Sequence, residues 1–124
     1  MAEIGIDIIA IDRIARILKK YPKFRSRVFT EKEISYCEKK KYPAQHYAVR
    51  FAAKESIMKA LGTGWAENIH WKDLEIRETS SGKPKVYLHG QAQVICKKQG
   101  IKEIKVSLSH CKAYGVALAQ VVKG

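Results

Sequence analysis

The sequence predicts an α+β fold: a single domain over residues 1–124, with a mainly antiparallel sheet and one long central helix. Short β-branched runs with alternating side chains lie near both ends of the chain, which is typical of strands. A stretch in the middle instead repeats its apolar residues every three or four positions, as a helix does. The length of 124 residues fits one domain, and the chain contains no internal repeat or linker.

One strand and two helices are expected in the first half of the chain. Residues 4–9 are predicted to form a buried strand, because they are a short run of mostly β-branched apolar residues. Asp12 is a plausible N-cap for a short helix, which Pro22 ends. Residues 30–33, with the sequence Thr-Glu-Lys-Glu, match a capping box that opens a second helix to about residue 40.

The second half begins with the long helix, which follows Pro43 and ends before Gly62. Residues 80–84 have the composition of a hairpin loop, and Gly100 ends a further short helix. The elements expected here are helices at residues 44–61 and 91–99 and strands at residues 74–77, 86–88, 104–109 and 114–122.

The chain is strongly basic, with 24 Lys and Arg against 12 Asp and Glu and a net charge of +12. Such a surface attracts nucleic acid, anionic lipid, phosphorylated cofactors or an acidic protein, and charge alone does not choose among them. Three widely spaced cysteines suit free thiols in a reducing cytosol. No apolar run is long enough for a membrane span, and none resembles a signal peptide. We therefore expect a cytoplasmic protein that does not associate with a membrane.

Glu55 falls on the apolar stripe of the long helix, which Tyr47, Phe51 and Met58 define by their spacing. A carboxylate taken out of water is costly unless it is paired or bound to a metal. Two interpretations stay open for Glu55: an ion pair with Lys59 one turn later, or a metal ligand.

Asp7 poses the same question in the first strand, where it shares a face with Gly5 and Ile9. It could be a turn residue at the end of the strand or the buried partner of a lysine. A third interpretation joins it to Glu55, because Mg²⁺ at phosphoryl-transfer sites takes one or two carboxylates and completes its shell with phosphate oxygens and water.

Phosphate-binding groups follow Glu55 within two helical turns. They are Lys59 and the small turn Gly62-Thr63-Gly64, whose backbone could approach a phosphate closely. The turn by itself is a weak signal. The chain has no GxxxxGK[ST] motif, which excludes a P-loop nucleotide hydrolase.

Five ordered blocks carry a family resemblance: Gly5-Ile6-Asp7, Arg50-Phe51-Ala52-Ala53-Lys54-Glu55-Ser56, Lys59-Ala60-Leu61-Gly62-Thr63-Gly64, Gly82-Lys83-Pro84 and Ser107-Leu108-Ser109-His110. The series resembles the 4'-phosphopantetheinyl transferases and, by length, their small type, the holo-[acyl-carrier-protein] synthases. The resemblance spans residues 4–122. Ser56 stands where the small type more often has alanine, and Cys111 is an unusual neighbour for the histidine. Neither departure affects a position expected to bind metal.

The resemblance implies an enzyme of fatty acid biosynthesis with the 4'-phosphopantetheinyl transferase fold. It would transfer the 4'-phosphopantetheine group of coenzyme A to a serine of apo acyl carrier protein and release adenosine 3',5'-bisphosphate. By similarity, Asp7 and Glu55 would bind Mg²⁺, and Glu55 and Lys59 would be catalytic. Gly62 and Thr63 would bind coenzyme A together with Lys59. The base that takes the serine proton stays open between Glu55 and a water molecule held by the metal.

The resemblance also implies a homotrimer with active sites shared between neighbours. Arg50 and His110 would bind the 3'-phosphate end of coenzyme A, and Lys83 and Pro84 would line the adenine. On an ideal helix Arg50 points about 140° away from Glu55, so one helix could serve two sites. From the residues alone, the preferred interpretations are an ordinary histidine at a strand end for His110 and an ordinary hairpin for residues 82–84.

The same resemblance implies that the basic residues near the N-terminus bind acyl carrier protein, because proteins of that class are strongly acidic. Arg13, Lys20, Lys23 and Arg27 are the candidates for steering that protein, although a solvated basic face is the alternative for each.

Two other functions compete with the enzyme. A small nucleic-acid-binding module would explain the charge, but no RRM, KH or zinc signature is present and the aromatic residues do not alternate with the basic ones. A purely structural domain would keep Asp7 and Glu55 in buried ion pairs. The five ordered blocks favour the enzyme, with no nucleic-acid partner.

Overall fold

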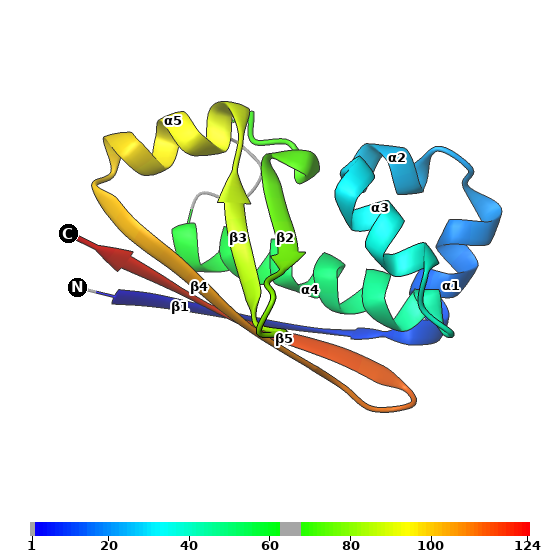
Figure 1. Cartoon of the computed structure of the whole chain (residues 1–124). Helices are drawn as coiled ribbons and strands as arrows, with labels where there is room; N and C mark the ends of the chain where they lie inside the picture. The colour runs from blue at the N-terminus through cyan, green and yellow to red at the C-terminus, as the bar shows by residue number, and fades with distance from the viewer. Residues whose placement is uncertain (1, 63–67) are drawn as a thin grey trace.

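The computed structural model describes residues 2–62 and 68–124. Within these residues the strands form two antiparallel sheets. Strands β1 (Ala2–Ala10), β5 (Tyr114–Lys123) and β4 (Ile101–His110) form one sheet in the order β1-β5-β4 (Figure 1). Strands β2 (Leu74–Glu78) and β3 (Pro84–Leu88) form a separate hairpin. The predicted α+β class and every predicted strand are confirmed.

The long helix α4 (Pro43–Leu61) lies along the three-stranded sheet and packs mainly against β1 and β5 (Figure 1). Pro43 occupies its first turn, where a missing N–H costs nothing. Gly62 ends it in the left-handed conformation, with φ of 76°. The helix therefore begins and ends as the sequence predicted, and it forms the centre of the hydrophobic core.

Three short helices gather at one end of α4 (Figure 1): α1 (Ile11–Lys20), α2 (Phe24–Val28) and α3 (Glu31–Glu38). The capping box of α3 is confirmed, since Thr30 and Glu33 exchange side-chain hydrogen bonds with each other's backbone N–H. Helix α5 (Gly90–Lys98) lies at the other end.

Two expectations about the first helices are corrected. Asp12 is not an N-cap but lies inside the first turn of α1, which continues directly from β1. The N–H of Ile11 donates to the carbonyl of Ala113 at 2.9 Å, so the β4–β5 turn holds this helix start instead of a side-chain cap. Helix α2 was not predicted, because a single turn carries too few residues to show a period.

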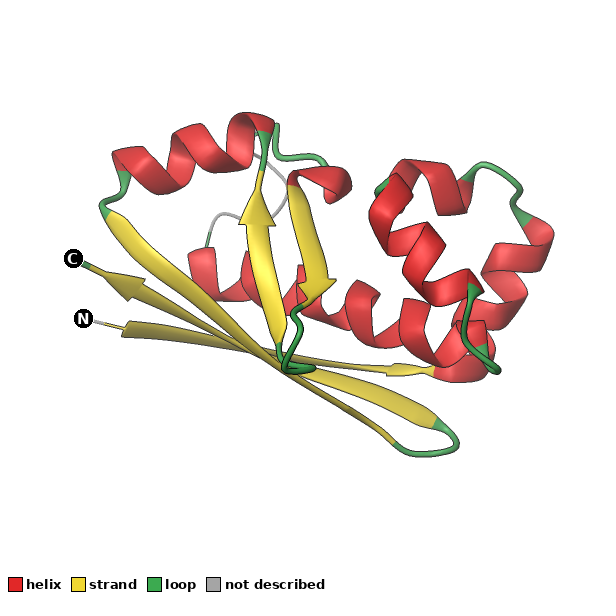
Figure 2. Ribbon diagram, in the orientation of Figure 1, coloured by secondary structure: helices red, strands yellow, loops and turns green. Residues whose placement is uncertain are grey.

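The strand of residues 4–9 is buried on one face only, which corrects the predicted burial. Gly5 and Ile9 face α4, but Ile4, Ile6 and Ile8 are 64%, 58% and 63% exposed. The helices lie on the other side of the three-stranded sheet (Figure 2). No helix in the described ranges has both the length and the apolar character to cross a membrane.

Candidate active site

Asp7 and Lys59, which are far apart in sequence, are in contact. The ammonium of Lys59 donates to Asp7 Oδ1 at 3.1 Å and to the carbonyl of Ile6 at 3.0 Å. The Asp7 side chain is 19% exposed and that of Lys59 55%, so the pair lies at the surface where a ligand can reach it. The contact agrees with one of the interpretations left open for Asp7, that of a partner for a lysine.

Glycine at two positions brings β1 against α4 and sets Asp7 beside the turn that carries Glu55. A Cβ on Gly5 would lie 1.9 Å from the carbonyl oxygen of Ser56, so only glycine allows this approach. At the other end of the strand, Ile9 pairs with Gly115, on which a Cβ would lie 3.0 Å from Val49. The strand therefore runs antiparallel to the helix between these two contacts.

Glu55 lies on α4 one turn before Lys59 and is half-buried. Residues four positions apart share a helix face, so Glu55, Lys59 and Asp7 converge on one surface. Within residues 2–62 and 68–124, this site included, no group of three or more His, Cys, Asp or Glu side chains could hold a metal ion. The assignment of Asp7 and Glu55 as metal ligands stays a prediction.

The predicted phosphate-binding turn is only partly described. Gly62 is exposed directly beyond the turn that carries Lys59, and a Cβ there would meet open space. Thr63 lies outside the described residues.

Arg50 is on a different face of α4 and is only 1% exposed. Its guanidinium lies over the Tyr36 ring at 4.2 Å and forms a 3.6 Å ion pair with Glu78 of β2. A ligand can contact Arg50 only if one of these two side chains moves. The prediction of a coenzyme A contact thus stays a prediction.

His110, at the end of β4, is exposed and meets a histidine that the sequence analysis did not select. Its ring centroid lies 6.1 Å from that of His46, on the first turns of α4. Burial lowers the pKa of His46, as do the positive charges of Arg50, Lys40 and His110. No motif marks His46, because only the fold brings it beside the end of β4.

Lys83 and Pro84 lie where the β2–β3 hairpin meets β4. The Lys83 carbonyl accepts hydrogen bonds from the N–H and the hydroxyl of Thr79, both at 2.9 Å, which closes the hairpin. Between the hairpin and β4 lies a groove of about 620 Å³, whose lining includes Lys83, Pro84, Lys105 and Ser107. This groove has the size of a nucleotide-binding cleft.

All four basic residues selected near the N-terminus, Arg13, Lys20, Lys23 and Arg27, are exposed. Lys23 and Arg27 also border a groove of about 690 Å³ between α1 and α2. Its floor is apolar and includes Ile17, Phe24 and Trp71. An acidic partner with an apolar ridge would complement this surface.

Lys54, next to Glu55, is fully buried, which the sequence analysis did not predict. Its ammonium donates to Glu33 Oε1 at 2.9 Å and to the carbonyls of Trp71 at 3.0 Å and Leu74 at 2.6 Å. All three N–H groups are thus satisfied, and α4 is tied to α3 and to the start of β2.

Comparison with known proteins assigns the family. The 4'-phosphopantetheinyl transferase superfamily matches residues 3–119. The chain belongs to this superfamily. A holo-[acyl-carrier-protein] synthase of Moorella thermoacetica is 47% identical over 121 residues, which cover 98% of this chain and 94% of that protein.

Solved structures of transferases agree with the fold. The holo-[acyl-carrier-protein] synthase of Neisseria meningitidis matches with a TM-score of 0.90 and 30% identity, over 98% of each chain. That of Bacillus anthracis, in complex with CoA (3',5'-ADP), matches with a TM-score of 0.81 and 32% identity, over 98% of this chain and 96% of that one. The transferase fold named by the resemblance is thereby confirmed.

Proposed function

We propose that this transferase moves the 4'-phosphopantetheine group of coenzyme A to a serine of apo acyl carrier protein, in cytoplasmic fatty acid biosynthesis. Family membership, the names of the relatives and the coenzyme A complex of the Bacillus anthracis structure support the proposal. The observation that carries it is the contact of Asp7 with Lys59, one helical turn from Glu55. The carboxylates of Asp7 and Glu55 can hold a cation, and the ammonium of Lys59 can contact phosphate oxygens. Together they suit a diphosphate substrate.

Asp7 and Glu55 suit Mg²⁺ by their chemistry, because this ion prefers carboxylate oxygens and leaves its other positions to phosphate and water. When bound there, Mg²⁺ would neutralise charge on the diphosphate of coenzyme A. Their number also fits, since a pair of carboxylates leaves the remaining coordination positions to the substrate.

In the reaction, the serine oxygen of the carrier forms a bond to the β-phosphorus of coenzyme A. The bond from that phosphorus to the oxygen bridging to the α-phosphate breaks, adenosine 3',5'-bisphosphate leaves, and the serine proton goes to a base. Lys59 already donates two hydrogen bonds, to Asp7 and Ile6. Its third N–H can be offered to an oxygen of the transferred phosphate, where it would offset developing charge.

The length of α4 supports the proposal that active sites are shared between subunits. At about 1.5 Å per residue, His46 and Lys59 lie roughly 20 Å apart along the helix axis. The 3'-phosphate and the diphosphate of coenzyme A hang from one ribose ring and do not span that distance. His110, whose ring lies beside that of His46, would therefore serve in one protomer the coenzyme A bound at Lys59 of another.

A homotrimer would also cover the exposed isoleucines of β1. Ile6 pairs across the sheet with Leu118, which is 42% exposed, so the apolar surface continues onto β5. A contiguous apolar face of this kind is typical of an interface between protein chains. We propose that a further copy of this chain packs there.

The proposed activity is tested by mass spectrometry of an apo acyl carrier protein after incubation with coenzyme A, Mg²⁺ and the enzyme. We expect the mass of one phosphopantetheine group on the serine. Glu55→Gln keeps the helix and the side-chain volume but removes a charged metal ligand, so transfer should fall at least about a hundredfold with folding intact. Glu31→Gln, at an exposed position of α3, is the matched control and should keep full activity.

The metal is tested without turnover. Coenzyme A should raise the melting temperature of the wild-type enzyme more in Mg²⁺ than in a chelator, and Glu55→Gln should remove the difference. An equal rise in both conditions would contradict the proposed metal site, and wild-type transfer by Glu55→Gln would remove Glu55 from the reaction.

A further inference from the structure

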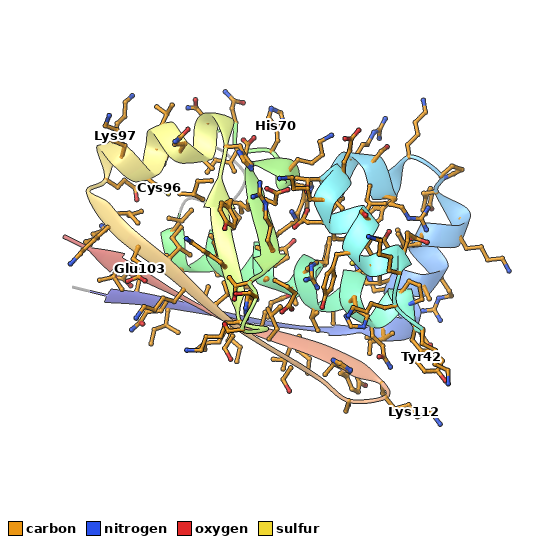
Figure 3. All side chains as sticks on the ribbon, viewed as in Figure 1. Tyr42, His70, Cys96, Lys97, Glu103 and Lys112 are labelled. Carbon is orange, nitrogen blue, oxygen red and sulfur yellow. The ribbon has the colours of Figure 1, made fainter. Side chains whose placement is uncertain are left out.

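Basic side chains gather at the end of the molecule where α4 begins and β4 ends. Two of them, Arg50 and Lys40, approach the same aromatic ring, that of Tyr36, at 4.2 Å and 4.6 Å. The ring of His46 meets Tyr36 edge-on at 5.8 Å and meets His110 at 6.1 Å. Figure 3 shows the same end of the molecule, with Tyr42 before α4 and Lys112 in the β4–β5 turn.

The charges around His46 are nearly all positive. Arg50 comes from its own helix, Lys40 from the segment after α3 and His110 from β4, while Tyr36 of α3 contributes only a neutral ring at ordinary pH. The nearby carboxylate of Glu78 pairs with Arg50 at 3.6 Å, beyond hydrogen-bond distance.

Arg50 itself is incompletely satisfied. Its Nη1 donates to the His46 carbonyl at 3.4 Å, but Nε and Nη2 have no hydrogen-bond partner in the described residues although they are buried. Buried guanidinium groups without partners are rare in proteins. An anion that reached this cluster would give the guanidinium a hydrogen-bond partner.

Space for an anion lies beside this cluster. A cavity of about 360 Å³ is lined by Tyr36 and Lys40, together with Lys32, Ser35 and Lys39. The cavity therefore shares two of its five lining residues with the basic cluster and adds two further ammonium groups.

We propose that His46 binds the 3'-phosphate of coenzyme A together with His110, and that His46 takes up a proton when this phosphate binds. The inference rests on the proposed function. A phosphomonoester has its second pKa near 6, so at about pH 7.5 it arrives mostly as a dianion. The dianion would stabilise the imidazolium, which burial and the surrounding cations disfavour in the free enzyme, and Arg50 adds a further positive charge.

The alternative role for His46 is packing between Tyr36 and His110. If His46 only packs, its replacement should change the stability of the protein and the affinity for any nucleotide. If His46 binds phosphate, its replacement should change the affinity only for molecules that carry the 3'-phosphate. Coenzyme A and 3'-dephospho-coenzyme A differ in that group alone and therefore separate the two roles.

The experiment is calorimetric titration of the full-length enzyme with both nucleotides, at about pH 7.5 in two buffers of different ionisation enthalpy. We expect proton uptake with coenzyme A and none with 3'-dephospho-coenzyme A. His46→Gln should weaken coenzyme A binding about tenfold, the size of one charge-assisted hydrogen bond, leave the dephospho compound unchanged and reduce the proton uptake. The preference for coenzyme A in the wild type should fall as the pH rises and the His46 imidazole loses its proton in the complex.

Two variants and a spectroscopic measurement complete the test. His46→Arg should keep the preference for coenzyme A and lose much of its pH dependence, and Gln45→Ala on the same turn should behave as wild type. If His46→Gln folds poorly, NMR titration of the wild-type imidazole should show its pKa rising on addition of coenzyme A.

An unchanged preference and unchanged proton uptake in His46→Gln would overturn the inference while wild-type transfer continued. A His46 imidazole whose pKa did not change on addition of coenzyme A would also overturn the inference. Failure of the wild type to bind coenzyme A, or to modify the carrier, would instead overturn the proposed function.

Discussion

Gly5 has only a hydrogen atom where other residues have a side chain, and this lets β1 approach α4 at Ser56. Gly5→Ala would place a methyl group 1.9 Å from a backbone carbonyl oxygen that the helix holds in place. We expect a loss of roughly 3 kcal/mol or more in the free energy of unfolding, at the upper end of overpacking costs. Urea denaturation measures it. Gly124→Ala, where a Cβ meets nothing closer than 3.6 Å, should leave stability unchanged.

Glu75 is a second residue whose environment gives a testable prediction. Its carboxylate is 3% exposed, and burial would raise its pKa. Hydrogen bonds from Thr30, His89 and Arg77 outweigh burial and hold the pKa at about 2, below the 4.5 of an unfolded chain. The charged form therefore stabilises the fold above about pH 4.5, and that contribution is lost as the pH falls towards 2.

Glu75→Gln should lose on the order of 3 kcal/mol at neutral pH, the equivalent of this pKa difference at about 1.4 kcal/mol per unit. Its stability should also change less than that of the wild type between about pH 4.5 and 2. Urea denaturation across this pH range checks both expectations. If the free energy of unfolding changed with pH in the same way for both proteins, the pKa of Glu75 would not be lowered in the folded state.

At the scale of elements, the buried contact of Lys54 with Glu33 joins α4 to α3. Lys54→Met keeps the side-chain length but leaves the carboxylate of Glu33 buried without its cation. Breaking a buried pair from one side costs about 3–5 kcal/mol, so we expect a loss of that size. Removing the charge from both sides should cost less than the sum of the single changes, because the residues are coupled.

A double-mutant cycle with Glu33→Gln measures this coupling through thermal or urea denaturation. Additive effects would mean that the two side chains contribute independently. Glu33 also accepts from the backbone N–H groups of Thr30 and Ile76, each on a different carboxylate oxygen. The single amide oxygen of Glu33→Gln can accept from only one of them, so this change carries a cost of its own that the cycle subtracts.

At the scale of the whole molecule, the exposed face of the three-stranded sheet predicts self-association. Ile6→Lys places a charge in that face without touching the core, so the protein should fold but sediment as a monomer. Transfer should then fall strongly, because the sites are proposed to be shared. Val94→Lys, at an exposed apolar position of α5, is the control and should remain a trimer. A fully active monomer would contradict shared sites.

The net charge of +12 predicts fast, salt-sensitive encounter with an acidic carrier protein. Arg13→Glu should slow association several-fold at low ionic strength and weaken its salt dependence, with little effect on coenzyme A binding. Lys97→Glu makes the same charge change on α5, at the other end of the molecule (Figure 3), and should have a smaller effect. Stopped-flow measurement of carrier binding distinguishes them, and equal effects would show that the charge acts without a preferred face.

Much of the fold was predictable because its signals are local. The capping box at Thr30, the proline in the first turn of α4 and the glycine after this helix act within a few residues. They therefore mark the same boundaries, to within a residue or two, in the sequence and in the structure. The short α2 and the start of α1 were missed for the opposite reason. Ile11 is held by the carbonyl of Ala113, which no local pattern reveals.

The candidate site likewise has features that the sequence predicts and contacts that only the fold reveals. By itself the sequence determined the class of fold, the basic charge and the five ordered blocks containing Asp7, Glu55 and Lys59, since residue types and spacing are written in the chain. Only the tertiary structure decided which side chains meet: Lys59 with Asp7, and His46 with His110. Such contacts depend on how strands and helices pack across long sequence separations, and a one-dimensional pattern carries no record of that packing.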